Sequence, residues 1–114
     1  MGNAPPTWYP RRREVYVVQL DKPRPAVVLS VDSINKFALD VCVVAITTAE
    51  HKKFSMRVPI KKGEANLNFN CWAKCDQVTT LEKALLRYPP LGVLSLETFG
   101  RIEGQVKICL GFVS

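Results

Sequence analysis

The sequence predicts a mainly β fold with some α structure: a small, half-open barrel with one C-terminal helix. Its 114 residues suffice for one compact domain but not for two. Short runs rich in β-branched and aromatic residues recur along the chain, separated by Pro, Gly, Asp and Asn. Only the C-terminal segment has apolar residues every three to four positions, as in an amphipathic helix. Many short strands with a single helix are typical of a small barrel.

The N-terminal half predicts a lead-in followed by three strands. Residues 1–10 contain three prolines and predict an extended lead-in, so one domain is expected over residues 11–114. Asp32 and Ser33 are expected to cap a short helical turn between the second and third strands. The three strands are expected at residues 14–20, 26–31 and 41–46.

The C-terminal half predicts shorter strands. Residues 54–60 alternate in polarity and predict an edge strand, because Pro59 cannot donate to a central ladder. After a turn, we expect a short strand at 67–69 and a longer one at 71–78. A helical turn is expected within residues 80–86, before the break at two consecutive prolines.

Ser95 is a good N-cap for the terminal helix, and Glu97 lies in its first turn, where the helix dipole favours negative charge. Gly100 and Gly104 weaken a helix, so we expect them to permit close backbone packing. The apolar stripe comprises Leu96, Phe99, Ile102, Val106, Cys109 or Leu110, and Val113.

Charge favours a polyanionic partner. Sixteen Lys and Arg against ten Asp and Glu give a net charge of +6. Such a balance suits a nucleic acid or a strongly acidic protein, although a merely basic protein would share it. No apolar run approaches the ~20 residues that span a bilayer, so no membrane association is expected. The N-terminal residues do not resemble a signal peptide.

The four cysteines do not predict a metal site. Cys42 and Cys109 lie in apolar patterns and are expected to be buried. Cys71 and Cys75 are four residues apart, and the one histidine, His51, is distant in sequence. We therefore expect no metal or cofactor, and reduced thiols in the cytoplasm.

Arg24 is the most informative residue. It stands between Pro23 and Pro25, directly before an apolar run, so the prolines hold it extended at the entrance of a strand. A permanently charged, planar guanidinium held in this way suits a phosphate. The alternative is a solvated arginine beside a strand.

Two further polar residues at strand ends, Thr47 and Asp76, could converge with Arg24. Cleavage of RNA without metal requires a base for the ribose 2′-hydroxyl and a cation for the charge that develops on the phosphate. Arg24 supplies a charge, Thr47 a hydroxyl and Asp76 a carboxylate. Polar residues also occur at strand ends for structural reasons alone.

Four segments, in order, resemble the MazF/PemK-type toxins, which are ribonucleases of bacterial toxin–antitoxin pairs. Together they span about residues 11–113. These segments are Arg12-Arg13-Glu14-Val15-Tyr16 with Arg24-Pro25-Ala26-Val27-Val28-Leu29-Ser30, then Ala45-Ile46-Thr47, then Lys74-Cys75-Asp76-Gln77-Val78-Thr79-Thr80-Leu81, and Leu91-Gly92 with the terminal helix.

The resemblance implies an SH3-like barrel of the CcdB–PemK type and a metal-independent, sequence-selective endoribonuclease. It implies single-stranded RNA or mRNA as substrate, a homodimer, and an acidic antitoxin as partner. Arg24 and Thr47 match the family's catalytic arginine and threonine, and Asp76 matches a carboxylate assigned as base in some members. The RNA-binding residues that we expect are Lys22, Lys74, Gln77, Lys52 and Lys53.

Three departures from the family pattern stand out. The loop before Arg24 is short, with only residues 21–23 between strand and arginine. Arg13 replaces a glycine that usually precedes the first strand. Lys74 replaces an arginine, and so keeps the charge without the planar fork.

Several alternatives stay open. Asp76 either accepts the 2′-hydroxyl proton or anchors the long strand. Trp72 belongs either to the core or dimer interface or to a base-stacking platform, and Trp8 and Tyr9 either stack on RNA or fold back on the barrel. His51 is either solvated or contacts RNA. At the level of function, the alternatives are a gyrase-poison-like toxin and a catalytically inactive RNA-binding barrel.

Overall fold

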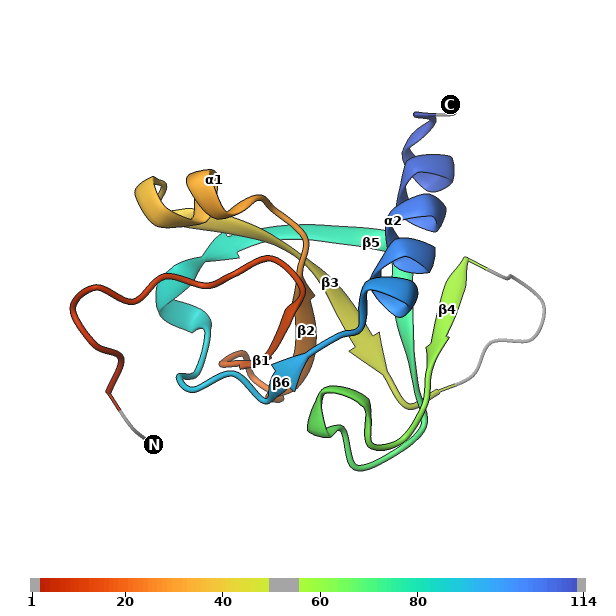
Figure 1. Cartoon of the computed structure of the whole chain (residues 1–114), viewed down its shortest axis with the longest axis horizontal. Helices are drawn as coiled ribbons and strands as arrows, with labels where there is room; N and C mark the ends of the chain where they lie inside the picture. Colours follow the sequence, from red (N-terminus) through yellow and green to blue (C-terminus); the bar gives the residue numbers. More distant parts are fainter. Residues whose placement is uncertain (1–2, 50–55, 113–114) are drawn as a thin grey trace.

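The computed structural model describes residues 3–49 and 56–112. Within them, six strands form one antiparallel sheet in the order β4-β5-β3-β2-β1-β6. The sheet is strongly curled, and α2 stands against the side that holds β5 and β4 (Figure 1). The predicted half-open barrel with a C-terminal helix is therefore confirmed. The elements are β1 (Glu14–Val18), β2 (Arg24–Val28), α1 (Asp32–Phe37), β3 (Asp40–Thr47), β4 (Arg57–Ile60), the 3-10 turn η1 (Glu64–Asn66), β5 (Cys71–Glu82), the 3-10 turn η2 (Lys83–Leu85), β6 (Gly92–Val93) and α2 (Leu96–Leu110).

The sheet has two faces, because successive side chains of a strand point to opposite sides. The helix face packs against the buried stripe of α2, formed by Phe99, Ile102 and Val106, and makes the larger core cluster. The other face, called the open face below, carries the second buried cluster. Its members are Tyr16, Val18, Ala26, Val28, Val41, Val43 and Leu86.

The lead-in folds back over one end of the open face. Trp8 donates from Nε1 to the Tyr16 hydroxyl at 3.2 Å, and its ring lies edge-on to Tyr16 and Tyr88 with centroids 6.0 Å away in each case. Pro10 is fully buried. Of the two alternatives for Trp8, the structure shows the folded-back one.

Helix α2 begins as predicted, at the N-cap Ser95, whose side chain accepts from Thr98 N at 3.1 Å. The expected close packing at Gly100 and Gly104 is wrong, since a Cβ at either would meet no atom within 4 Å. Leu96 and Leu110 are also exposed rather than part of the buried stripe. None of the described helices is long and apolar enough to cross a membrane.

Several element boundaries differ from the prediction. The expected strand at 67–69 is absent, because η1 ends at Asn66 and a loop follows it up to β5. The expected helical turn within 80–86 is only η2, since β5 continues to Glu82 through ladder pairing with β3. The N-cap of α1 is Val31 without a side-chain cap, and Asp32 instead accepts from Arg12 N at 2.8 Å. β1 is shorter than expected, and β2 starts earlier, at Arg24 itself.

The prediction that Cys42 and Cys109 are buried is wrong. Cys71 and Cys75 are buried, whereas Cys42 and Cys109 are only half-buried. Cys71 and Cys75 are four positions apart on β5, so both point to the helix face, which carries the larger core cluster.

Candidate active site

Arg24 is the first residue of β2 and lies opposite Val18 of β1. Pro23 and Pro25 flank it, and Pro25 keeps its place in the ladder opposite Val17. Arg24 is exposed, whereas Val18 is 2% exposed. The extended arginine predicted at a strand entrance is thus held at the rim of a buried cluster.

The β2–β3 register brings Thr47 to Arg24. Ala26 pairs with Ala45 in this ladder. This is the last pair of the ladder; continued by two residues along both strands, the same register would put Arg24 across from Thr47, on the face that carries Ala26. Directly opposed residues of antiparallel strands have Cα atoms about 4.5–5.5 Å apart. Both side chains therefore project from the open face, beside one another.

The next strand adds Trp72 and Lys74 to this face. Thr47 pairs with Trp72 of β5, and Arg57 of β4 pairs with Lys74. Ala73 and Cys75, which alternate with Trp72 and Lys74, are fully buried on the helix face. Trp72 and Lys74 therefore point to the open face, and both are partly exposed.

A bulge in β5 turns Asp76 and Gln77 to the same face. The β3–β5 register shifts between Val44 and Ile46. Cys75 and Val78 both pack on the helix face although they are three positions apart, which in a regular strand would put them on opposite faces. This change of phase requires Asp76 and Gln77 to lie together on the opposite side of the strand. Both are exposed.

Thr47 is held by its own turn. Its Oγ1 accepts a hydrogen bond from Ala49 N at 3.1 Å, and the carbonyl of Ala49 in turn accepts from Arg57 Nη1. A hydroxyl that accepts in this way keeps its own proton for donation. Thr47 can therefore donate to a phosphate oxygen on the open face.

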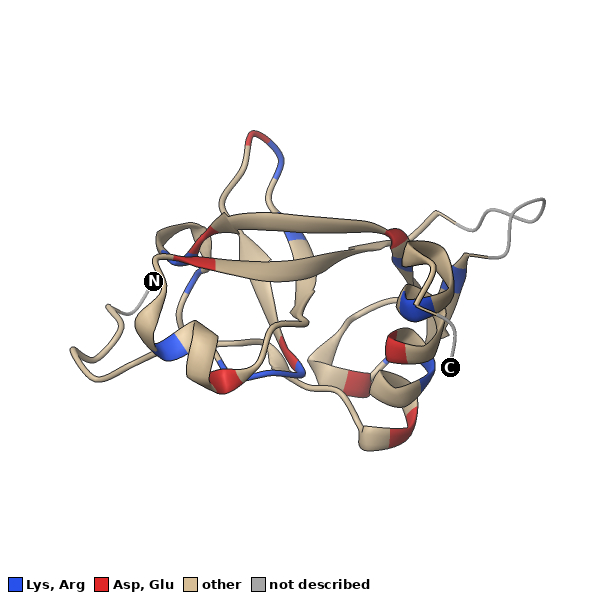
Figure 2. Cartoon of the chain, turned by 90° about the horizontal axis from the view of Figure 1, so that it is seen from above, with Lys and Arg blue, Asp and Glu red and all other residues tan. Residues whose placement is uncertain are grey.

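Within the described part of the chain, Lys22, Arg24 and Lys74 form no ion pair with a carboxylate. The ion pairs among the described residues are Arg11–Asp32, Arg12–Glu103 and Arg101–Glu97, all elsewhere in the fold. A pocket at the base of the projecting β1–β2 loop is lined by Gln19, Leu20, Asp21, Lys22 and Arg24, and the loop stands clear of the sheet (Figure 2). Lys22 thus lines the same pocket as Arg24.

Cys75 lies under the bulge and is not a candidate nucleophile. Burial, followed by the proximity of Cys109, raises the pKa of Cys75 to about 12, so its thiol stays protonated at neutral pH. Over residues 3–49 and 56–112, we find no group of three His, Cys, Asp or Glu placed to hold a metal ion.

The structure thus brings together Arg24, Thr47, Lys22 and Lys74, and turns Asp76 and Gln77 to their side of the sheet. Lys52, Lys53 and His51 lie outside the described residues. The catalytic and RNA-binding roles of all these residues stay predictions. Sequence reasoning missed Arg57 and undervalued Trp72, because their placement depends on the pairing of β4, β5 and β3.

Comparisons with known proteins give the family and the fold of the chain. The family model of PemK-like, MazF-like toxins of type II toxin–antitoxin systems matches residues 11–110. Comparison with curated protein sequences gives no significant match.

Similar solved structures include three toxins. A mycobacterial endoribonuclease in complex with its cognate antitoxin has a TM-score of 0.81 at 24% identity, covering 92% of this chain and 98% of that one. The toxin MazF-mt6 of Mycobacterium tuberculosis has a TM-score of 0.77 at 23% identity, covering 87% and 97%. A MazE–MazF structure from Deinococcus radiodurans has a TM-score of 0.76 at 19% identity, covering 93% and 100%.

Proposed function

Since the chain belongs to the PemK-like, MazF-like toxins of type II toxin–antitoxin systems, we propose that it is a metal-independent endoribonuclease. Its substrate is single-stranded RNA or mRNA, cut within short sequence motifs. The observation that supports the proposal is the β2–β3 register: continued two residues beyond Ala26 and Ala45, it puts Arg24 across from Thr47, and neither Arg24 nor Lys74 forms an ion pair with a described residue.

Each residue has a distinct role in this reaction. The ribose 2′-oxygen attacks the adjacent phosphorus, the bond from phosphorus to the 5′-oxygen breaks, and a 2′,3′-cyclic phosphate and a 5′-hydroxyl end result. Arg24 offsets the charge that develops on the phosphate oxygens, because a guanidinium stays protonated at neutral pH. Thr47 donates its hydroxyl proton to one of those oxygens and so orients the phosphate.

Asp76 is assigned as the base that takes the 2′-hydroxyl proton, and water protonates the departing 5′-oxygen. Asp76 is exposed, and among the described residues no hydrogen bond or ion pair engages its carboxylate. A carboxylate that anchored the strand would need such a partner, so the base role has the stronger support.

The partner of the toxin is proposed to be an acidic antitoxin. The net charge of +6 and the cations Lys22, Arg24, Arg57 and Lys74 on one side of the sheet favour a polyanionic or acidic ligand. The mycobacterial endoribonuclease with which this chain shares its fold is described as a complex with its cognate antitoxin. We also propose a homodimer that works in the cytoplasm.

The test is to incubate the purified protein with a long single-stranded RNA in EDTA and to map the ends of the fragments. Discrete cuts with 5′-hydroxyl ends, lost in Arg24→Ala and kept in the α2 surface variant Lys107→Ala, support the proposal. Intact RNA with an inhibited gyrase would instead indicate a gyrase-poison-like toxin. RNA that is bound but intact would indicate an inactive RNA-binding barrel.

A further inference from the structure

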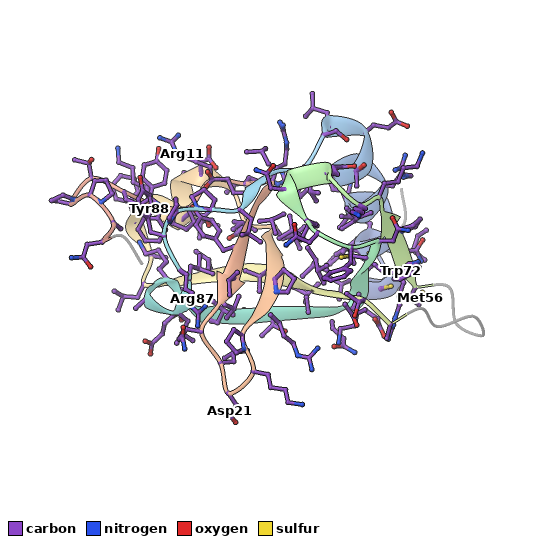
Figure 3. The ribbon with its side chains drawn as sticks, turned by 90° about the horizontal axis from the view of Figure 1, so that it is seen from below. Arg11, Asp21, Met56, Trp72, Arg87 and Tyr88 are labelled. Carbon is purple, nitrogen blue, oxygen red and sulfur yellow. The ribbon has the colours of Figure 1, made fainter. Side chains whose placement is uncertain are left out.

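A second pocket adjoins the one beside Arg24. Trp8, Gln19, Arg87 and Tyr88 line it, together with Asn3, Ala4, Lys83, Ala84 and Leu86. Gln19 belongs to both pockets, so they share a wall. Arg87 and Tyr88 lie toward the end of the molecule where the lead-in is, and Trp72 lies at the other end (Figure 3). A strand of nucleic acid that crosses the sheet at Arg24 can therefore continue into this second pocket.

The backbone fixes the path between the two pockets. Arg24 pairs with Val18, and Val18 forms a bridge with Leu86, so the three positions make one row across the sheet. Gln19 N donates to Leu85 O at 2.7 Å, and Arg87 N donates to Val17 O at 3.0 Å. The segment that carries Arg87 thus runs along β1 as an added strand would. Neighbouring strands lie about 4.8 Å apart, which puts the Cα atoms of Arg24 and Leu86, the two ends of this row, about 10 Å from each other. Arg87 is the next residue after Leu86.

The pocket offers the groups that recognise a nucleotide. Arg87 donates from Nε to Gln19 Oε1, and among the described residues its terminal nitrogens have no acceptor. A guanidinium held at Nε presents its remaining N–H groups as a fork that fits a phosphate. The amide nitrogen of Gln19 is left to donate to the edge of a base. Lys83 contributes less to phosphate binding in this pocket, because its Nζ already donates to Asn35 O at 2.8 Å.

Trp8 is held in place before any ligand binds. Its indole Nε1 donates to the Tyr16 hydroxyl at 3.2 Å, and Tyr16 donates in turn to Glu14 Oε1 at 2.7 Å. The contacts with Tyr16 and Tyr88 are both edge-on. The ring is only half-buried although it belongs to a packed aromatic cluster. A fixed, partly exposed indole is a suitable stacking surface for an unpaired base.

We propose that this pocket binds one unpaired base and its adjoining phosphate, from the same RNA strand that is cut at Arg24. The base stacks on Trp8, and Arg87 holds the phosphate. This subsite rests on the proposed function, since it extends the path of that substrate. It uses the lead-in and the turn after η2, two segments that the reaction at Arg24 does not need.

Binding of uncleavable oligonucleotides tests the subsite. The probe is a single-stranded, mixed-sequence oligonucleotide with 2′-deoxyribose throughout, fluorescently labelled and lengthened stepwise at either end. In the unmodified protein, lengthening at one end is expected to tighten binding by about fivefold or more, the effect of stacking one base. Trp8→Leu and Arg87→Gln should lose this gain and bind the shortest probe as the unmodified protein does. Trp8→Phe, which keeps a ring, should retain most of the gain.

The salt dependence separates a phosphate contact from a structural role. In Arg87→Gln, the slope of log Kd against log salt for the long probe should fall by about 0.7, the value for one lost contact with a single strand. Lys107→Gln on α2 is the charge-matched control and should change neither the gain nor the slope. If Trp8→Leu fails to fold, as judged by circular dichroism, the binding gain and the salt slope are measured on Arg87→Gln and Trp8→Phe instead.

The results also separate the subsite from the reaction. Cleavage of RNA without any gain on lengthening, or a gain kept in Arg87→Gln, overturns the subsite alone. A gain lost in Arg87→Gln in a protein that never cuts RNA supports the subsite as a nucleic-acid contact and overturns the reaction.

Discussion

Thr47 lies directly opposite Trp72 in the β3–β5 ladder. The β2–β3 register, continued two residues beyond Ala26 and Ala45, puts Arg24 on the other side of Thr47, so that an aromatic ring, a hydroxyl and a guanidinium follow one another across three strands. A base, a phosphate and a ribose can all be contacted along such a row. Each side chain comes from a strand of the same sheet, so the backbone sets the spacing of the row before RNA binds.

Asp76→Asn tests the base. The change keeps the shape of the side chain and removes its ability to accept a proton. Because the carboxylate is exposed and unpaired within the described part of the chain, the melting temperature should stay within about 1 °C, while the cleavage rate falls by about 100-fold or more. Gel-based cleavage of labelled RNA measures the rate. An unchanged rate would assign the proton to another group.

Substitutions of Arg13 test how much its left-handed backbone conformation destabilises the fold at a position where the family usually has glycine. Its φ is 79°, a left-handed conformation that a glycine adopts freely. Its side chain compensates in part, since Nε donates to Leu94 O at 3.1 Å. Arg13→Gly and Arg13→Ala both remove that bond, but only glycine removes the strain. Chemical denaturation should find Arg13→Gly more stable than Arg13→Ala by about 1 kcal/mol, and equal stability would contradict the strain.

Replacing Gly92 and Gly104 by alanine should change the free energy of unfolding in opposite directions. A Cβ at Gly92 would lie 2.8 Å from the backbone carbons of Ala65, so Gly92→Ala should destabilise by about 1–3 kcal/mol. At Gly104 a Cβ meets nothing within 4 Å, so Gly104→Ala should stabilise α2 by about 0.5–1 kcal/mol. Thermal unfolding of both variants measures the contrast. If Gly104→Ala destabilised the protein, the result would indicate that α2 is closely packed at Gly104, as expected from the sequence.

Cys75 gives the protein a stability limit at high pH. Burial first, then the nearby Cys109, raises the pKa of Cys75 from 9.0 to about 12 in the folded protein. The unfolded chain therefore binds fewer protons above pH 9, and stability should fall as pH rises from about 9 through about 12. Tyr16, whose pKa is also raised, chiefly by burial and then by its hydrogen bond to Glu14, acts in the same direction.

Urea denaturation at several pH values measures this limit. Cys75→Ala should flatten the decline, and Cys42→Ala, at a half-exposed thiol, is the matched control and should not. The decline would persist unchanged in Cys75→Ala if the thiol were not responsible.

Local signals predicted much of the fold. The edge position of β4 followed from Pro59, and the N-cap and buried stripe of α2 from Ser95 and the apolar spacing. The strand expected near Phe69 was wrong because alternation with asparagines resembles a strand, whereas the left-handed backbone at Ala65 and Asn66 forms a turn. The left-handed backbone conformation of Ala65 depends on the packing around it, and no nearby residue in the sequence predicts it.

The site was predictable as a list of residues but not as an arrangement. The prolines around Arg24 indicated an extended, directed cation, and β2 begins there. The bulge that turns Asp76 and Gln77 to one face depends on the pairing of β5 with β3. Arg57, which holds the turn after Thr47, and the pocket of Trp8 and Arg87 join segments that are distant in sequence.

A double-mutant cycle on Arg24 and Thr47 tests most directly the claim that both act on one phosphate. Single-turnover cleavage of one labelled RNA in EDTA is measured for the unmodified protein, Arg24→Ala, Thr47→Ala and the double variant. We expect each single variant to lose about 100-fold or more, and the double variant to be about as slow as the slower single one, because the two groups act as a unit. The claim would be contradicted if the fold-losses in rate of the two single variants multiplied in the double variant. It would also be contradicted if either single variant kept the rate of the unmodified protein.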